Sequence, residues 1–466
     1  MRRPEYKYGV LVVYIAALFV QILDATIVNV ALPVLSDEFG VSVTEVDAVA
    51  IAFTVALAVS IPPAGWLSDR FGSKTVFLVS LAIFTGASAL CGAAGSLEQL
   101  VAFRILQGIG AGLITPVGSA MLFRAFPLEE RAVAANAVLS VAVIAPATGP
   151  VLGGAIVDNA SWRWIFFINV PIGIMALVLG WLWLRNDESA PAGRFDVPGF
   201  VLSSLGLAGI VFAVSIAPEA GWLDPLTLLF GLGGLAAFAV LVPWELRLDN
   251  PLLHLGLLRE RLFRTFNLIG VFFYGGFIGL LIILTLYLQT HRGFSAFEAG
   301  LAQAPQAIGV FLLSNLAGRR LYRRFGPRPM FISGTVGAFV FTGVLVFVDN
   351  GTPLWLIGGL MFLRGTSVGT VFLPMQTGIY TNIAQAQLSR ATSVFNTQRQ
   401  AAPAFGIAIT TTVLAMAEPS IGLGPESGGD GLGAFRWAFL ASALLFVPAI
   451  ALSLLVRSDD AKATRA

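Results

Sequence analysis

Residues 67–74 read LSDRFGSK, and residues 321–328 read LYRRFGPR. Leucine, arginine, phenylalanine and glycine recur at the same positions of the two segments, and the last residue of each segment is basic. A second match follows in each half of the chain, FRILQG at 103–108 and FLRGTS at 362–367. The two matches have nearly the same offset, so the pattern indicates a duplicated chain. Chance similarity of short segments is the alternative for the repeat taken alone.

The composition around these segments is that of an integral membrane protein. Of the 466 residues, 57% are hydrophobic and 12% are charged, about half the charged fraction of a soluble domain. The mean hydropathy is +0.84. The net charge of +2 provides no basic field for nucleic acid. These values exclude a soluble globular protein, a disordered protein and a nucleic-acid-binding protein.

Apolar stretches are numerous enough for a polytopic protein, since a spanning helix needs about 20 mostly apolar residues. Asp24 and the length of the first stretch argue for a retained span rather than a cleaved signal. We predict fourteen spans, at residues 9–31, 47–67, 75–95, 98–122, 132–156, 164–184, 198–217, 225–244, 265–289, 297–317, 330–348, 353–377, 391–416 and 434–456.

The repeat and the spans together predict an all-α membrane protein with three parts. A six-helix bundle is expected at 1–190, two inserted central helices with their linkers at 191–250, and a second six-helix bundle at 251–466. Duplicated halves are typical of secondary transporters, whose substrate site lies between the halves. Alternating across the spans leaves 22 of the 28 lysines and arginines on the side of the two termini, which predicts cytoplasmic termini.

Asp24 is the acidic residue that lies well inside a predicted span. A charge at that depth costs at least about 2.5–3.5 kcal/mol on insertion scales, and such residues are usually functional. Because burial favours the neutral form of a carboxyl group, we predict that Asp24 exchanges a proton. A structural ion pair with an intramembrane arginine is the alternative.

Arg104 is the nearest candidate partner for Asp24, and the two residues form our candidate proton-coupling site. Gln107 and Gly108 share the helical face of Arg104. Gly108 and Gly112 have the spacing of a close helix contact. A structural arginine bonded to backbone carbonyls is an equally open interpretation of Arg104.

Polar residues scattered through the spans are candidates for a substrate cavity. Interhelical hydrogen bonds are common in membrane proteins, so each residue alone is weak evidence. The candidates are Tyr14, Gln21, Asp24, Gln107, Tyr274, Gln303, Gln306, Gln376, Asn396 and Arg399.

Two segments are candidates for conformational gating. The fifth span contains APATGPVLGG at 145–154, where small residues recur every four positions between prolines that permit bending. Asp69, after the second span, is placed to cap a helix that starts near Arg390. Tight packing and a solvated turn are the respective alternatives. The gating candidates are Gly65, Asp69, Arg70, Gly72, Lys74, Pro146, Gly149, Pro150 and Gly153.

The residues needed for other activities are missing from the sequence. No GxxxxGK[ST] phosphate loop occurs, so ATP hydrolysis is not expected. One cysteine, Cys91, and two histidines, His254 and His291, leave no cysteine–histidine metal set and no serine–histidine–aspartate arrangement at membrane depth. We expect no enzyme activity, no cofactor and no metal.

Five segments together resemble the fourteen-span drug–proton antiporters of the major facilitator superfamily. They are LDATIVNVALP at 23–33, GWLSDRFGSK at 65–74, FRILQGIGAG at 103–112, APATGPVLGG at 145–154 and WRWIFFINVPIG at 162–173. The resemblance implies the major facilitator fold and proton-driven export of lipophilic, often cationic compounds by alternating access. It also implies that Asp24 is a protonation site, that Asp69 stabilises the outward-facing state and that Arg104 assists proton coupling.

The chain departs from the family pattern at two places. Asp47 stands where an aromatic residue is usual, and Arg323 stands in the second repeat where Asp69 stands in the first. We expect a monomeric, proton-coupled multidrug efflux antiporter of the bacterial inner membrane whose partners are small lipophilic substrates, protons and lipid, without nucleic acid. The alternatives are a dedicated exporter of one metabolite or lipid, and a non-transporting scaffold or receptor.

Overall fold

The computed structural model describes residues 5–186, 193–221, 224–314, 318–420, 432–457 and Asp460. Every regular element in these ranges is a helix. The first half contains α1 (Tyr6–Phe39), α2 (Val43–Val46), α3 (Ala48–Ser60), α4 (Ala64–Phe71), α5 (Ser73–Gly92), α6 (Leu97–Ala125), α7 (Arg131–Asn159), α8 (Trp164–Phe167) and α9 (Asn169–Trp183). The inserted pair is α10 (Val197–Ala220) and α11 (Pro225–Glu245). The second half contains α12 (Arg261–Leu286), α13 (Ala296–Leu312), α14 (Gly318–Phe325), α15 (Pro327–Val344), α16 (Leu354–Gly378), α17 (Leu388–Ser420), α18 (Leu432–Leu444) and α19 (Phe446–Leu454).

Eleven of the described helices are long and apolar enough to cross a membrane, or twelve if the bent pair α3–α4 counts as one span. The chain is therefore a multi-pass membrane protein. The two other predicted spans fall on α7 and on α13, which has 17 residues, and neither helix meets that test. The count of fourteen stays a prediction.

The second predicted span, at 47–67, is broken rather than continuous. Its two helices, α3 and α4, meet at a bend of 57°. The break contains Pro62 and Pro63, each of which lacks a backbone N–H and clashes with the preceding turn. Two such residues in succession end α3 and redirect the chain into α4.

The internal repeat is visible in the backbone. α4 and α14 each have eight residues and end at a phenylalanine, and a glycine follows each of them. Gly72 has φ 81° and Gly326 has φ 77°, a region that residues with a Cβ rarely adopt. The glycine that the two repeats share thus makes a similar turn into α5 and into α15.

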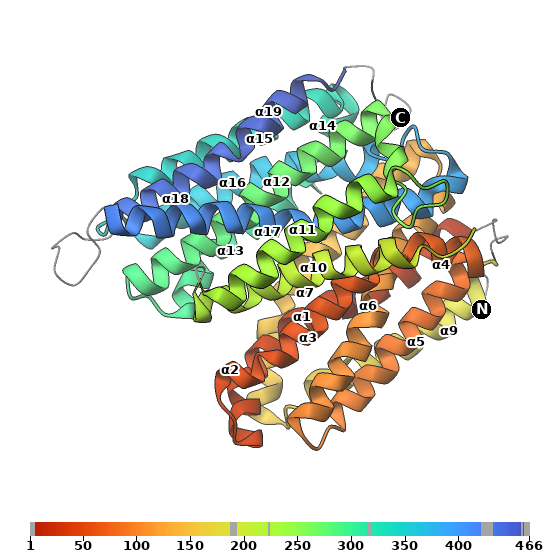
Figure 1. Cartoon of the computed structure of the whole chain (residues 1–466), viewed down its shortest axis with the longest axis horizontal. Helices are drawn as coiled ribbons and strands as arrows, with labels where there is room; N and C mark the ends of the chain where they lie inside the picture. Colours follow the sequence, from red (N-terminus) through yellow and green to blue (C-terminus); the bar gives the residue numbers. More distant parts are fainter. Residues whose placement is uncertain are drawn as a thin grey trace.

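The helices form two bundles joined by the inserted hairpin (Figure 1). In the first bundle α6 packs against α3 and α5, and α1 packs against α7. In the second, α16 packs against α13 and α15, and α12 packs against α17. α10 contacts both α3 and α17, so the inserted hairpin lies against both bundles, and α11 packs on α10. The partition at residues 190 and 250 stays a prediction.

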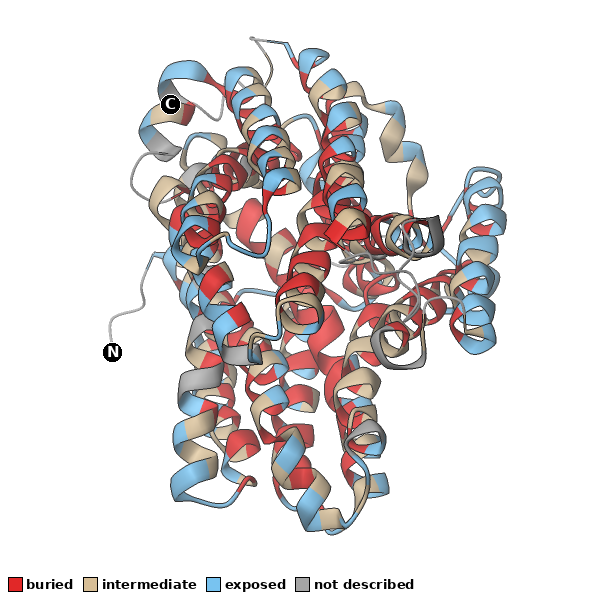
Figure 2. Cartoon of the chain, turned by 90° about the vertical axis from the view of Figure 1, so that its left-hand side faces the viewer, coloured by how far each residue is buried: buried red, intermediate tan, exposed pale blue. Residues whose placement is uncertain are grey.

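Burial follows the two bundles. Figure 2 shows buried residues along the middle of the molecule and exposed ones on the outer faces of the helices. Large apolar side chains are common on those outer faces; Trp181 is 70% exposed and Leu229 is 67% exposed. Such surfaces suit contact with lipid chains rather than water.

The two bundles run between the same two ends of the molecule. α1 begins and α19 ends at one of these, where Figure 1 marks both chain termini. We call it the terminal end and the opposite one the distal end. At the distal end, α2 of the first bundle and the start of α18 of the second bundle lie far apart in Figure 1.

Candidate functional site

Asp24 lies in a closed cage inside the first bundle. Its Oδ2 accepts a hydrogen bond from Arg104 Nη1 at 2.5 Å. Its Oδ1 accepts from Gln107 Nε2 at 2.9 Å and from Asn169 Nδ2 at 2.8 Å. The carboxylate thus receives three donors from α6 and α9, an arrangement that suits the ionised form.

Arg104 is fixed by further contacts. Its Nε donates to the carbonyl of Val49 at 3.2 Å, and its guanidinium carbon lies 4.1 Å from the ring centroid of Phe53. Asp24 is 0% exposed and Arg104 is 1% exposed. The alternatives considered from the sequence, an ion pair with Asp24 and a bond to a backbone carbonyl, therefore occur together.

Two members of the cage were not among the sequence candidates. Asn169 donates to Asp24, and Ser88 Oγ lies 3.1 Å from both Asn169 Nδ2 and Gln107 Nε2. Both residues are fully buried. An asparagine within the apolar run WIFFINVPIG was a signal that could have identified Asn169.

A separate cavity of about 130 Å³ lies between the two bundles. Its residues come from α1, α6 and α7 on one side and from α16, α17 and the segment after α16 on the other. They are Tyr14, Leu18, Gln21, Ile22, Thr115, Ser119, Leu122, Phe123, Ala135, Val138, Leu139, Ala142, Gln376, Tyr380, Phe395, Asn396 and Arg399. Five sequence candidates are thus brought together here, namely Tyr14, Gln21, Gln376, Asn396 and Arg399.

The other five cavity candidates do not line this cavity. Asp24 and Gln107 belong to the cage. Gln303 donates to Thr285 Oγ1 at 2.9 Å. Gln306 accepts a hydrogen bond from Arg364, and Tyr274 is 7% exposed within the core of the second bundle. Their polar groups bind neighbouring helices or pack beside the cavity instead of facing it.

The second bundle has its own buried arginine but no carboxylate beside it. Arg364, the repeat counterpart of Arg104, is 0% exposed. Within the described part of the chain its donors go to Gln306, to Thr342 Oγ1 at 3.0 Å and to backbone carbonyls of α12. A buried arginine thus occurs in both bundles, as Arg104 and Arg364, whereas the buried acid beside it, Asp24, is found in the first bundle.

Gln21 connects the cavity with the cage. It lies one helical turn before Asp24 on α1 and lines the cavity. Its Oε1 accepts a hydrogen bond from Thr115 Oγ1 at 3.0 Å. The layer of Gln21 and Thr115 thus separates Asp24 from the cavity in this conformation.

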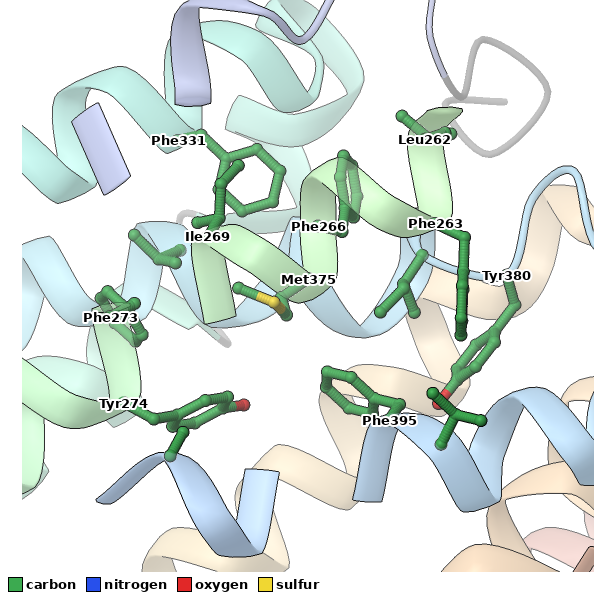
Figure 3. Close-up of a cluster of buried hydrophobic side chains, with 14 of the residues drawn as sticks. Leu262, Phe263, Phe266, Ile269, Phe273, Tyr274, Phe331, Met375, Tyr380 and Phe395 are labelled. Carbon is green, nitrogen blue, oxygen red and sulfur yellow. The ribbon is translucent and has the colours of Figure 1, made fainter. Parts of the chain in front are cut away.

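Aromatic residues close the cavity on its terminal side. The rings of Phe123 and Tyr380, one from each bundle, lie 5.1 Å apart. Tyr380 also contacts Phe395 at 6.1 Å. Figure 3 shows Tyr274 and Tyr380 extending toward Phe395 from two sides of the same apolar cluster.

Nearer the terminal end than these aromatic residues, polar contacts join the two bundles. Arg390 Nε donates to Asp69 Oδ2 at 2.6 Å. Arg124 Nη2 donates to Ser389 Oγ at 2.5 Å, and Ser393 Oγ donates to the carbonyl of Pro62 at 2.8 Å. These hydrogen bonds between the first and second bundles close the molecule at this end.

The gating candidates take different positions around this closure. A Cβ added at Gly65 would lie 3.2 Å from the Cα of Arg390, so the glycine permits the close approach of α4 and α17. Lys74 Nζ donates to the carbonyl of Trp181 at 3.2 Å, within the first bundle, and Arg70 is exposed. Gly72 makes the turn described above.

The glycine seam of α7 packs on α1 beside the cage. A Cβ added at Gly149 would lie 2.2 Å from Thr26 Oγ1, and one at Gly153 would lie 3.0 Å from Ile27 Cγ1. Pro146 is half-buried on the same helix. The side chain of Pro150 lies outside the described residues. The seam therefore holds α7 close to the helix that carries Asp24.

His254 extends the closing ion pair. Arg390 Nη1 donates to His254 Nε2 at 2.6 Å, which requires a neutral imidazole with its proton on Nδ1. Burial, and secondarily the charge of Arg390, lowers the pKa of His254 to about 4. His254 belongs to the linker between the inserted hairpin and α12, so this linker takes part in the closure.

Acid is expected to weaken the closure through His254. In an open state, where the imidazole leaves Arg390, its pKa returns toward 6.5, so the open state binds the proton first. The contribution of His254 to closure is therefore full above pH 6.5 and is lost as the pH falls toward 4. The opening is measured as the distance between spin labels at Arg70 and Arg320, two exposed residues of the terminal end. In His254→Gln this distance is expected to change less as the pH falls. His291→Gln, at the distal end, is the matched control; an unchanged profile in His254→Gln contradicts the prediction.

Two helix bundles with an internal repeat, enclosing a cavity of polar and apolar residues that is closed at one end, define a membrane transporter. The chain belongs to the Major Facilitator Superfamily, whose family model matches residues 14–407. It is 34% identical over 421 residues to the multidrug export protein EmrB of Haemophilus influenzae, covering 88% of this chain and 81% of that protein.

Two further comparisons agree with this assignment. The chain is 33% identical over 404 residues to the fatty acid resistance protein FarB of Neisseria gonorrhoeae, covering 85% of this chain and 78% of that protein. The fold matches the human organic anion transporter MFSD10 with a TM-score of 0.69 at 14% identity, over 96% of this chain and 99% of the other. At that identity the structural match shows the fold alone.

Proposed function

We propose that the chain is a proton-coupled efflux antiporter that exports lipophilic compounds from a bacterial cell through the inner membrane by alternating access. The observation that carries the proposal is the caged carboxylate of Asp24, one helical turn from the cavity residue Gln21. A buried acid beside a substrate cavity allows a proton and a substrate to affect each other through one helix.

The gating contacts give the transport cycle a direction. With both termini in the cytoplasm, as the distribution of basic residues predicts, the closure by Asp69 and Arg390 seals the cytoplasmic side and the structure is outward-facing. Opening of the Gln21–Thr115 layer admits a proton to Asp24. Protonation removes the negative charge that holds Arg104, releases substrate outward and permits the return; deprotonation inside restores substrate binding.

Relatives support export of several compounds. Among the proteins that the chain resembles, EmrB is named for multidrug export and FarB for fatty acid resistance. A monomer is sufficient, because both walls of the cavity come from one chain. An exporter of a single metabolite or lipid with the same fold is the second candidate, and the apolar wall that α7 supplies to the cavity is compatible with it.

Reconstituted protein tests the function. Proteoliposomes with an imposed pH gradient are expected to move several unrelated lipophilic compounds against their gradients, and a protonophore is expected to stop the movement. One accepted compound in a broad panel favours the dedicated exporter. If the pH gradient moves none of the compounds, the proposal is contradicted and a scaffold or receptor is favoured.

A further inference from the structure

We propose that the central cavity binds an anionic amphiphile, a lipophilic carboxylate, with its head group at Arg399. The inference rests on the proposed function and assigns a charge to its substrate. Arg399 lines the cavity from α17. It is the one charged side chain among the seventeen residues that line the cavity, and none of the seventeen is an aspartate or a glutamate.

Arg399 differs from the two other arginines at similar depth. Arg104 pairs with Asp24, and Arg364 bonds to Gln306 and Thr342. Among the described residues, no ion pair or hydrogen bond of Arg399 is found. An intramembrane cation that faces a cavity without a protein counter-charge marks a substrate pathway, and its natural complement is an anion from outside the chain.

One wall of the cavity, the one that α7 supplies, is apolar, and polar side chains lie on the other walls. The second bundle supplies Gln376, Asn396 and Arg399. In the first bundle, α1 and α6 add polar residues such as Gln21 and Thr115, whereas α7 supplies only apolar ones, Ala135, Val138, Leu139 and Ala142. A ligand with a charged head and an apolar body fits this division, with its head toward α16 and α17 and its body toward α7.

Asn396 supports the same orientation. It precedes Arg399 by three residues, so both side chains lie on one face of α17. Its Nδ2 donates to the carbonyl of Thr392 at 2.7 Å. The amide is thereby held on the face of α17 that carries Arg399, whose planar donors match the two oxygens of a carboxylate.

Binding of a cationic ligand is disfavoured in this cavity. The fixed charge of Arg399 repels it in a partly dehydrated space where electrostatic forces are strong. No carboxylate of the lining offsets that repulsion, because Asp24 lies behind the layer of Gln21 and Thr115 and is paired with Arg104. The cavity therefore selects by charge against the lipophilic cations that the family resemblance suggests.

Three probes with one apolar body and different head groups test the proposal. Radiolabelled 1-naphthaleneacetate, 1-naphthaleneacetamide and 1-naphthylmethylammonium are bound to the full-length protein in nanodiscs at pH 7. The carboxylate is expected to bind more tightly than the amide, and the ammonium more weakly. Arg399→Gln is expected to lower carboxylate affinity roughly tenfold to a hundredfold, the effect of losing one charge-assisted contact, and to leave amide affinity nearly unchanged.

Controls separate this proposal from the proposed function. Unchanged amide binding shows that Arg399→Gln is folded, and Arg399→Lys is expected to keep part of the carboxylate preference. Arg247→Gln removes an exposed arginine of the linker and is expected to change nothing. Ammonium binding as tight as carboxylate binding, or carboxylate binding unaffected by Arg399→Gln, overturns the proposal. If gradient-driven flux of other compounds persists in that case, the proposed function stands; if no compound moves, the proposed function fails as well.

Discussion

Asp24→Asn is expected to abolish transport driven by a pH gradient while the protein stays folded. Asparagine has nearly the same shape as aspartate, and its oxygen can still accept a hydrogen bond from Arg104, Gln107 or Asn169. It cannot exchange a proton, so the link between proton and substrate is lost. Uphill flux in proteoliposomes should fall to background, whereas exchange of substrate down its own gradient should continue because alternating access itself remains.

The control for this variant is Asp158→Asn, which makes the same chemical change at an exposed position near the distal end of α7. It should transport at the rate of the unmodified protein. Carbodiimide labelling adds an independent measurement, because the reagent modifies a protonated carboxyl group that it can reach. Asp24 is 0% exposed here, so labelling should require conditions that open the Gln21–Thr115 layer. Gradient-driven flux retained by Asp24→Asn, or an Asp24 that stays unlabelled at every pH and gradient, contradicts proton coupling at this residue.

The sequence was most informative about which residues carry charge at depth. Asp24, Arg104 and Arg364 stand out because charges are rare in spans, and the structure places the first two in contact. Asn169 was not predicted, because its role depends on α9 packing beside α1 and α6, and a contact between helices distant in sequence cannot be derived from the periodicity of one helix. The repeat placed Gly72 and Gly326 at one position of one motif, and the structure adds that both have a positive φ.

The cavity shows where periodicity stops being informative. Gln303 and Gln306 share one face of α13, as their spacing predicts. That face meets Thr285 of α12 and Arg364 of α16 rather than the cavity. A helix in a bundle has several polar contacts available, and the pattern identifies the polar face without identifying its neighbour. The break of the second span had a local signal, the adjacent Pro62 and Pro63, but the prediction treated 47–67 as one continuous span and was wrong there.

Loss of the ion pair between Asp69 and Arg390 is expected to shift the protein strongly toward states that are open at the terminal end. Asp69 is 5% exposed, and its partner is only partly exposed. A hydrogen bond to a charged group contributes about 2 kcal/mol, so either Asp69→Asn or Arg390→Gln should change the ratio of closed to open molecules roughly thirtyfold. Spin labels at Arg70 and Arg320 should report longer distances, and transport should slow because the state that is closed at the terminal end is less populated.

A double-mutant cycle distinguishes this pair from a general loss of surface charge. If Asp69 and Arg390 act on each other, the double variant should open little more than either single one, because the second change removes a contact already broken. Glu130→Gln serves as the matched control, since Glu130 pairs with Lys7 at 2.8 Å within the first bundle and does not join the bundles. Additive effects in the double variant, or equal opening in Glu130→Gln, would contradict the role of this pair. The closure would then depend on the other contacts of α17, chiefly the hydrogen bonds from Arg124 and Ser393.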